Sequence, residues 1–157
     1  MSVPLAVVVG SSFTGRRELW RSIASPPIAR FEAHGIAAGG KLYVFGGFYN
    51  TRMDASTRSD VYDPETNAWT RLADMPEPIT HAPIVADGTM LYLLGGYVAG
   101  HPGGSTTHVW KYDSVAGTWH VGPALPAPRG AGAAARVGRS LHFFGCLLYT
   151  SPSPRDS

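Results

Sequence analysis

The chain has 157 residues, of which 44% are hydrophobic, and this supplies enough apolar material for a domain with a core. Its formal net charge of +2 is too small to indicate binding to nucleic acid or to an anionic membrane, and its 11 arginines are scattered rather than clustered. No run approaches the ~20 apolar residues of a membrane-spanning helix. The sequence does not identify the cellular compartment. The single cysteine, Cys146, excludes an intrachain disulfide and favours the reducing cytoplasm.

The first 25 residues predict two strands, at 7–13 and 19–23. Phe13 precedes Trp20 by seven residues, and an aromatic residue seven positions before a tryptophan recurs later in the chain. We interpret residues 1–25 as the degenerate outer half of a repeating unit.

The first complete unit, residues 26–74, predicts four strands. Gly39-Gly40 separates the first strand from the second, and Gly46-Gly47 ends the second. Residues 63–67 have the sequence Asp-Pro-Glu-Thr-Asn, which is typical of a turn between the third strand and the fourth. The four strands are expected at residues 31–38, 41–45, 59–62 and 68–72.

The second unit, residues 75–124, repeats this order 49 or 50 positions later. Residues 125–145 then begin a third unit with two strands. A period of this length, made of strand-like segments, is typical of a β-propeller or a related array. The strands are expected at 82–86, 90–94, 108–112 and 118–121 in the second unit, and at 130–137 and 141–144 in the third.

Three landmarks recur in both complete units: a double glycine after an apolar strand, a Tyr-Asp pair, and a tryptophan seven residues after the tyrosine. Paired glycines permit positive φ and close backbone approach. The aspartates can accept hydrogen bonds within their turns, and the aromatic rings can fill the space between units. A tryptophan can also be a ligand platform, but recurrence favours the structural role. The positions are Gly46, Gly47, Tyr62, Asp63 and Trp69, then Gly95, Gly96, Tyr112, Asp113 and Trp119.

This pattern resembles the kelch repeat over roughly residues 19–145. The resemblance implies an all-β fold, namely a kelch-type β-propeller in which each unit is a four-stranded antiparallel blade around a central axis. Kelch propellers generally have six or seven blades. Two blades and two flanking half-blades are therefore expected to form a fragment whose ring is not closed, with exposed terminal faces that favour aggregation.

Residues 146–157 have no counterpart after Gly47 or Gly96. The composition changes abruptly after Gly145, and the segment resembles the translated sequence of a sequencing-library adapter. We expect this tail not to be native, and Cys146 is therefore not considered a nucleophile.

Two arginines are candidates for ligand binding because they hold equivalent positions before the first strand of a unit. These are Arg30 and Arg129, whereas the unit between them has Ile79. The sialic-acid mutarotases are kelch propellers in which charged residues converge on the central channel. Similarity to them implies that such arginines bind the carboxylate of an acidic sugar. The alternative is hydrogen bonding to backbone carbonyls at the mouth of the strand. Glu32 and His34 follow Arg30 and have no charged counterparts after Arg129.

Two long connections, residues 48–58 and 97–107, are the other candidates. Binding residues concentrate on loops that a rigid scaffold positions, and these two loops differ in sequence although the strands repeat. The alternative is a plain solvated connection, and residues 102–105 of the second loop are expected to be flexible. The candidate residues are Tyr49, Asn50, Arg52, Tyr97 and His101.

We expect no catalytic residue, metal site or cofactor in this chain. Its six histidines show no pair at metal-ligand spacing, and no phosphate-binding glycine motif is present. The kelch resemblance implies a binding module whose partner is another protein, docked on the loops or over the channel mouth. The alternatives are a fragment of a mutarotase-like enzyme with a small sugar ligand, and a fragment of a substrate adaptor with an upstream oligomerisation domain.

Overall fold

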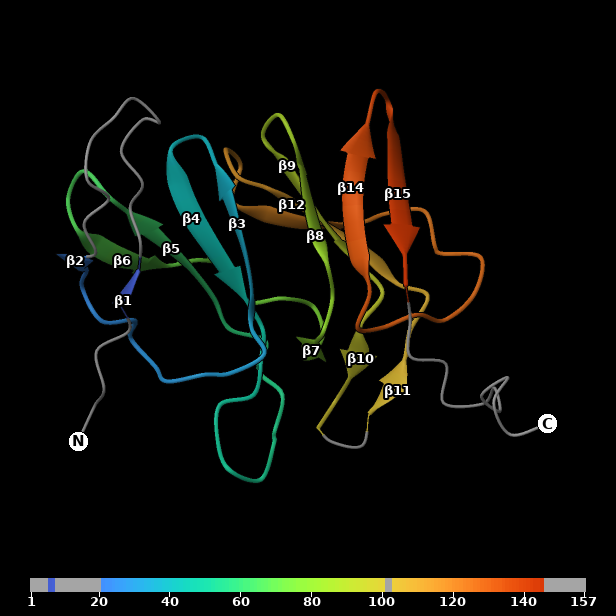
Figure 1. Ribbon diagram of the computed structural model, residues 1–157, viewed down its shortest axis with the longest axis horizontal. Coiled ribbons are helices and arrows are strands. Elements are labelled where there is room, and N and C mark those ends of the chain that lie inside the picture. The colour runs from blue at the N-terminus through green and yellow to red at the C-terminus, as the bar shows by residue number, and fades with distance from the viewer. Residues whose placement is uncertain (1–5, 8–20, 101–102, 146–157) are drawn as a thin grey trace.

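The computed structural model describes residues 6–7, 21–100 and 103–145, and every regular element within these ranges is a β-strand (Figure 1). The described residues contain no helix that is long and apolar enough to cross a membrane. Because the regular elements of the described residues are all strands, the predicted all-β class is confirmed. His101 and the tail 146–157 lie outside the described residues, and the prediction of a non-native tail stays a prediction.

Two four-stranded antiparallel sheets form the centre of the molecule, as predicted. In each, the strands follow one another in space in chain order. Blade 1 consists of β3 (His34–Ala38), β4 (Lys41–Phe45), β5 (Ser59–Asp63) and β6 (Ala68–Arg71). Blade 2 consists of β8 (Ile84–Asp87), β9 (Met90–Leu94), β12 (Val109–Asp113) and β13 (Thr118–Val121).

Shorter pairs of strands flank the two blades. At the start, β1 (Ala6–Val7) pairs with β2 (Arg21–Ser22), but residues 8–20 lie outside the described ranges, and the predicted outer half-blade is not tested. At the other end, β14 (Ala133–Val137) and β15 (Ser140–Phe144) form the predicted antiparallel hairpin of a third unit.

The first strand of each unit begins later than predicted, at residues 34, 84 and 133 instead of 31, 82 and 130. The cause is a residue with positive φ before each strand. Glu32, His81 and Ala131 hold equivalent positions and have φ values of 53°, 55° and 54°. Left-handed backbone cannot continue an extended ladder, so the strand starts only after it.

A third sheet was not predicted. It contains β7 (Ile79–Thr80), β10 (Tyr97–Val98) and β11 (Gly104–Ser105), in the order β11-β10-β7. The prediction that residues 97–107 form a loop without strands is therefore wrong at Tyr97–Val98 and at Gly104–Ser105. Strands of two residues have no alternating pattern, and the sequence cannot indicate them.

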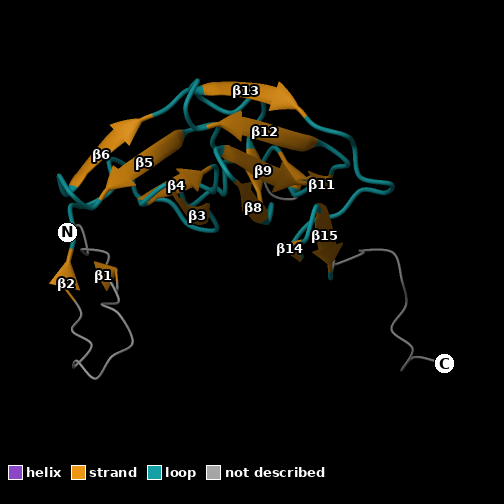
Figure 2. Cartoon of the chain, turned by 90° about the horizontal axis from the view of Figure 1, so that it is seen from above, coloured by secondary structure: helices purple, strands orange, loops and turns teal. Residues whose placement is uncertain are grey.

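The sheets lie side by side in an arc that does not close (Figure 2). The strands β3, β8 and β14 follow its inner side, and β6 and β13 follow its outer side. The main core lies between blades 1 and 2, where Tyr43 and Phe45 pack with Leu91, Leu93 and Tyr112. A smaller cluster between blade 2 and the last hairpin contains Val85, Leu94, Val109, Leu141 and Phe143.

The double glycines bring neighbouring units into backbone contact. Gly46 has a φ of 59°, and a Cβ built there would lie only 2.2 Å from the carbonyl oxygen of Ile79. The next amide, of Gly47, donates a hydrogen bond of 3.2 Å to the same oxygen. In the next unit, Gly96 N–H donates to the carbonyl of Arg129 at 2.7 Å. The glycines are therefore points at which each unit touches the start of the following one.

The repeated tryptophans join neighbouring units in the same way. Trp69 Nε1–H donates to the carbonyl of Ala24 at 2.8 Å, and Trp119 Nε1–H donates to the carbonyl of Ala73 at 3.0 Å. The rings of Phe45 and Trp119 meet edge to face, with centroids 5.3 Å apart. Both indoles are thus bonded to the preceding unit, as the structural role predicts.

The repeated aspartates hold the turns that follow them. Asp63 Oδ1 accepts a hydrogen bond from Glu65 N–H at 2.9 Å, and Asp113 Oδ1 accepts from Val115 and Ala116 N–H at 2.9 and 3.0 Å. These backbone donors lower the pKa of Asp113, and an ion pair with Lys41 is the first cause of the lowered pKa of Asp63.

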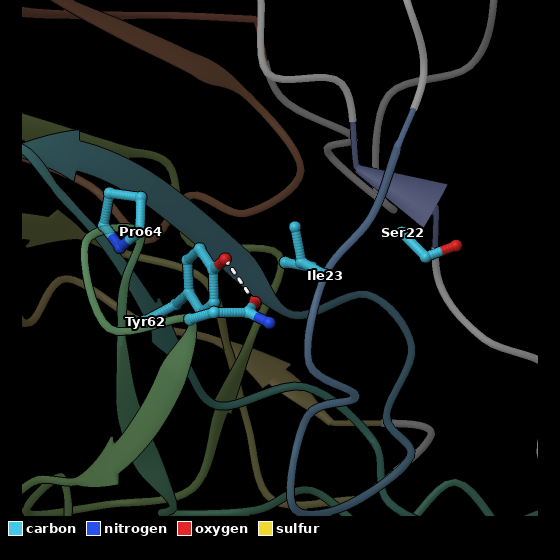
Figure 3. A pocket seen from close by; sticks show the side chains of 5 residues that line it. Ser22, Ile23, Tyr62 and Pro64 are labelled. Atoms are coloured by element: carbon cyan, nitrogen blue, oxygen red, sulfur yellow. Dashed lines mark hydrogen bonds between the residues drawn. The ribbon is translucent and has the colours of Figure 1, made fainter.

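A small pocket lies where the first segment meets blade 1 (Figure 3). Ser22, Ile23, Tyr62, Pro64 and Asn67 line it, and Tyr62 O–H donates to Asn67 Oδ1 at 2.8 Å. Its volume is about 140 Å³. Pockets for small-molecule ligands usually measure ~300 Å³ or more, and this one is therefore a packing gap rather than a ligand site.

Candidate binding site on the loop face

One end of the arc carries the two long connections that follow β4 and β9, and we call it the loop face. It comprises residues 46–58, the described part of 95–107, and the segments 30–33, 79–82 and 129–132 that lead into the inner strands. In Figure 1 this is the lower end of the molecule, opposite the short turns that follow β3, β8 and β14. Most candidate residues of the sequence analysis lie here.

Asn50 holds the first loop in shape. Its Oδ1 accepts hydrogen bonds from the N–H groups of Arg52 and Asp54, each at 3.1 Å, and its Nδ2 donates to Asp54 Oδ2 at 2.7 Å. The pKa of Asp54 is lowered, first by this bond from Asn50 and then by Arg52. Asn50 therefore positions the loop, and its side chain is directed into the loop rather than to a partner.

Three large side chains project from this part of the loop face. Arg52 is 81% exposed in its side chain, Tyr49 is 50% exposed, and Phe31 is 43% exposed. Phe31 was not among the sequence candidates, because it was assigned to the first predicted strand of the unit, residues 31–38. The positive φ of Glu32 turns the chain at this point, and Phe31 packs beside Phe48, with ring centroids 5.3 Å apart.

The second loop packs against the first. A Cβ at Gly100 would lie 3.0 Å from the carbonyl oxygen of Met53, and Ala99 N–H donates to the carbonyl of Pro78 at 3.1 Å. Tyr97 is half-buried, and its ring meets that of His81 nearly at right angles, with centroids 5.3 Å apart. The structure thus brings the two candidate loops together as one surface.

A contact between a glutamate and a histidine links blades 1 and 2 on the loop face. Glu32 Oε2 and His81 Nε2 lie 3.1 Å apart, and these residues hold equivalent positions in successive units. Burial, with a smaller effect from His81, lowers the pKa of His34 to about 4, and its Nε2 has no hydrogen-bond partner among the residues that the structure describes. His34 is therefore neutral at physiological pH.

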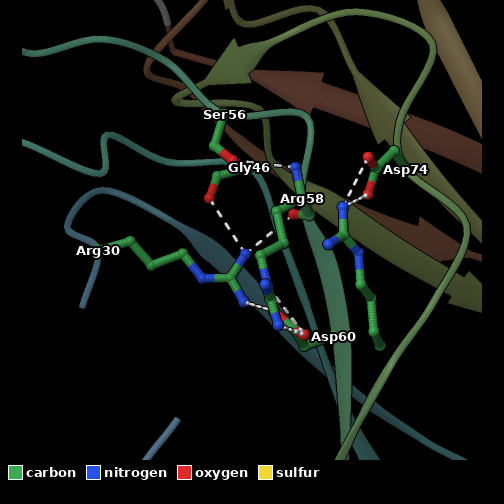
Figure 4. A network of polar contacts seen from close by, with 7 residues as sticks. Arg30, Gly46, Ser56, Arg58, Asp60 and Asp74 are labelled. Carbon is green, nitrogen blue, oxygen red and sulfur yellow. Dashed lines mark hydrogen bonds and ion pairs between the residues drawn. The ribbon is translucent and has the colours of Figure 1, made fainter. Parts of the chain in front are cut away.

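Arg30 is engaged inside blade 1 (Figure 4). Its side chain is 4% exposed and forms an ion pair with Asp60, which is 0% exposed. Its Nη1 also donates to the carbonyls of Arg58 at 2.9 Å and Gly46 at 3.5 Å. Arg58 contacts Asp60 from the other side at 2.9 Å. Burial lowers the pKa of Arg30, although Asp60 opposes this effect.

Blade 2 replaces this buried ion pair by apolar residues. Ile79 stands where blade 1 has Arg30, and Trp110 stands where blade 1 has Asp60. Ile79 is buried, and Trp110 packs against the same core cluster. The carboxylate of blade 2 comes from the connection between β6 and β7: Glu77 Oε1 lies 2.6 Å from both His108 Nδ1 and Trp110 Nε1. Arginine and aspartate are thus exchanged together for isoleucine and tryptophan.

Arg129 holds the position of Arg30 in the third unit but has different surroundings. Its carbonyl accepts a hydrogen bond from Gly96 N–H, and its backbone pairs with Thr106. No acidic side chain of the described ranges forms an ion pair with its guanidinium. The two arginines that the sequence makes equivalent therefore differ: Arg30 is neutralised and Arg129 is not.

No group of three or more His, Cys, Asp or Glu residues among the described parts of the chain is placed to hold a metal ion. The loop face instead offers exposed aromatic rings, an exposed arginine, a Glu–His pair and one half-buried arginine without an acidic partner. These groups suit recognition of another molecule.

Comparison with known proteins agrees with the repeats seen in the fold. The family model described as the kelch motif matches residues 29–76 and 78–126, which correspond to blades 1 and 2 with their connections. The chain belongs to the kelch-repeat family. A kelch repeat-containing protein of Arabidopsis thaliana is 30% identical over 128 residues, which cover 80% of this chain and 30% of that protein.

An enzyme and a solved structure are also similar to this chain. The N-acetylneuraminate epimerase of Yersinia enterocolitica is 42% identical over 85 residues, covering 49% of this chain and 22% of the enzyme. The solved structure of YjhT superposes with a TM-score of 0.73 at 17% identity, covering 83% of this chain and 48% of that one, and this likeness shows the fold. The chain spans less than a third of the length of the Arabidopsis protein and of the Yersinia epimerase.

Proposed function

We propose that this kelch chain is a binding module that contacts a protein partner through its loop face. Kelch repeats indicate a protein-interaction propeller module. The proposal adds the surface: Phe31, Tyr49 and Arg52 form its centre, with Tyr97 and the Glu32–His81 pair at its border.

The observation that carries the proposal is the contrast between the repeated and the unrepeated aromatic residues. Trp69 and Trp119 are engaged between units by hydrogen bonds to backbone carbonyls. Tyr49 and Phe31 are about half exposed beside an arginine that is 81% exposed. Aromatic residues and arginine are the residue types that carry most of the free energy at protein interfaces.

Selection of peptides from a random phage-displayed library on the folded chain tests this proposal. The affinities of the selected peptides are then measured for the variants Tyr49→Ala and Arg52→Ala, and for Arg139→Ala, which changes an exposed arginine at the opposite end of the molecule. We expect each loop-face variant to weaken binding about thirtyfold or more, since hot-spot residues cost ~2 kcal/mol or more on truncation. Peptides that bind all four proteins equally would show that the partner docks elsewhere.

A second function is favoured by Arg129 and by the similarity to N-acetylneuraminate epimerase. In this alternative the chain is part of an enzyme that acts on an acidic sugar, and Arg129 binds the sugar carboxylate by a bidentate contact. Arg30 is less suited to that role because Asp60 already neutralises it. Titration of the chain with N-acetylneuraminate, monitored by NMR, tests the alternative. Arg129→Gln should abolish the chemical-shift changes, and the absence of changes with the unaltered chain would exclude sugar binding here.

A further inference from the structure

The residue that leads into each inner strand has a left-handed backbone in all three units, although none of the three is glycine. Glu32, His81 and Ala131 have φ values of 53°, 55° and 54°. Glycine takes this conformation without the strain that a Cβ brings, and it would serve the fold better here. The backbone repeats but the side chains do not, so the repeat does not account for the glutamate and the histidine. Strained residues of this kind are concentrated at ligand sites, and Glu32 and His81 are therefore candidates for a function.

His81 holds the Glu32 carboxylate in a defined position. Its Nε2 lies 3.1 Å from Glu32 Oε2, and its Nδ1 lies 3.0 Å from the hydroxyl oxygen of Thr80, a residue that is 0% exposed. A neutral imidazole satisfies both contacts when Nε2–H donates to the carboxylate and Nδ1 accepts from the threonine hydroxyl. In this form His81 orients Glu32 without neutralising its charge.

Two aromatic rings keep the imidazole in this orientation. The ring of His81 meets those of Phe48 and Tyr97 at interplanar angles of 72° and 88°, with centroids 6.2 and 5.3 Å apart. Phe48 also packs against Phe31, which is the exposed ring next to Glu32 in the chain. The carboxylate therefore lies beside a row of four rings that crosses from blade 1 to blade 2.

The charge of Glu32 is available to another molecule. Its side chain is 45% exposed, and among the described residues no arginine or lysine forms an ion pair with it. His34, two positions further along, is neutral because burial lowers its pKa to about 4. A carboxylate attracts a cation through charge-assisted hydrogen bonds, and the face of an aromatic ring attracts a cation as well. The two groups together suit a positively charged side chain.

We propose that Glu32, oriented by His81 and flanked by Phe31, binds a basic side chain of the protein partner, either lysine or arginine. This inference rests on the proposed function and deepens it, because it assigns one specific contact of the loop face. His81 is the positioning residue of this contact. Phe31 contacts the methylene groups that carry the cation.

Double-mutant cycles with peptides selected on the loop face test this contact. Peptides that lose affinity for Tyr49→Ala are synthesised again with lysine replaced by norleucine, or arginine by citrulline, which removes the charge. Isothermal titration calorimetry measures the affinity of both forms for the original chain and for Glu32→Gln. We expect each change alone to weaken binding about tenfold, and both together to weaken it no more than either one. Glu65→Gln changes an exposed glutamate in the turn after β5 and should alter the affinity less than twofold.

The outcomes separate this inference from the proposed function. Loop-face peptides that contain no basic residue, or two losses that multiply independently, would overturn the contact with Glu32 and leave the proposed function intact. Peptides whose affinity is unchanged by both Tyr49→Ala and Arg52→Ala would overturn the proposed function, and this inference with it.

Glu32→Gly distinguishes a role in binding from a role in folding. Glycine relieves the left-handed strain that glutamine retains, so Glu32→Gly should unfold at a urea concentration no lower than Glu32→Gln does. Its affinity for the basic peptides should nevertheless fall about tenfold. If Glu32→Gly is instead the less stable variant and binds the basic peptides as the original chain does, Glu32 serves the fold and the proposal is wrong.

His81→Phe tests the positioning residue. Phenylalanine keeps a ring between Phe48 and Tyr97 but removes the nitrogen that orients Glu32. We expect this variant to weaken the basic peptides about threefold and to leave the norleucine and citrulline peptides unchanged. Equal losses for the charged and neutral peptides would show that His81 acts through packing alone, and would refute its positioning role.

Discussion

Gly46→Ala should weaken the joint between blades 1 and 2, and Gly88→Ala provides a closely matched control. The two glycines have φ values of 59° and 60°. A Cβ at Gly88 meets nothing within 4 Å, whereas at Gly46 it lies 2.2 Å from Ile79 O and 2.9 Å from the Met75 methyl carbon. The two variants thus share the same backbone strain, and only one adds a clash.

The magnitudes follow from these contacts. Left-handed alanine costs about 1–2 kcal/mol in either variant. At Gly46 the Ile79 carbonyl must also retreat by about 1 Å, which weakens its hydrogen bond from Gly47 N–H, a loss of about 1 kcal/mol. Ile79 is buried, and shifting it overpacks the core at a cost of about 1–3 kcal/mol. We expect a loss of about 3–6 kcal/mol for Gly46→Ala against about 1–2 kcal/mol for Gly88→Ala.

Urea unfolding followed by tryptophan fluorescence measures the free energy of unfolding of both variants. The indoles of Trp69 and Trp119 lie between units and report on their separation. If the free energy of unfolding of Gly46→Ala depends less steeply on urea concentration than that of the original chain, the two blades unfold separately. Equal losses in the two variants, within about 0.5 kcal/mol, would refute the reasoning that close approach is what requires glycine at 46.

Three other predictions use the same assay. Asp60→Asn should cost about 3–5 kcal/mol because Arg30 is left buried without its partner, and adding Arg30→Met should restore part of this loss; a double variant less stable than the single one would contradict the pairing. His34 has a folded pKa of about 4, below its unfolded value near 6.5, so the unfolded state binds more protons between these values and stability falls as pH is lowered through them. His34→Gln should reduce this loss by about 2.5 kcal/mol at pH 4.5, and an unchanged pH profile would exclude the burial argument. Trp119→Phe removes the hydrogen bond to the Ala73 carbonyl, and the free energy of unfolding should fall by about 1 kcal/mol more than the lost apolar area accounts for. A loss explained by apolar area alone would mean that water hydrogen-bonds to the Ala73 carbonyl in place of the indole.

The repeated part of the fold could be predicted because each signal in it is local. An apolar strand, a double glycine and an Asp-led turn each lie within a few residues, and recurrence at one period places them in space. The short sheet of β7, β10 and β11 could not be predicted, because its pairing depends on Ile79 and Tyr97, which lie in different parts of the chain and follow no alternating pattern.

The candidate site was predictable only in part. The sequence indicated the two loops and the equivalence of Arg30 and Arg129, but not that the first arginine is neutralised by a residue 30 positions away. The sequence did contain one signal of this pairing. When the two units are aligned, the unit with Ile79 in place of Arg30 also has Trp110 in place of Asp60. The exposure of Phe31 had no such signal, since it follows from the left-handed backbone of the residue after it.

The paired exchange between the blades has a consequence for protein design. Consensus design averages a repeat family column by column and treats positions as independent. Averaging the two blades of this chain in that way can combine arginine with tryptophan, or isoleucine with aspartate. Either hybrid buries a charge without its counter-charge, although each residue is native to one parent. Artificial arrays built from such units should therefore inherit these two columns as a linked block.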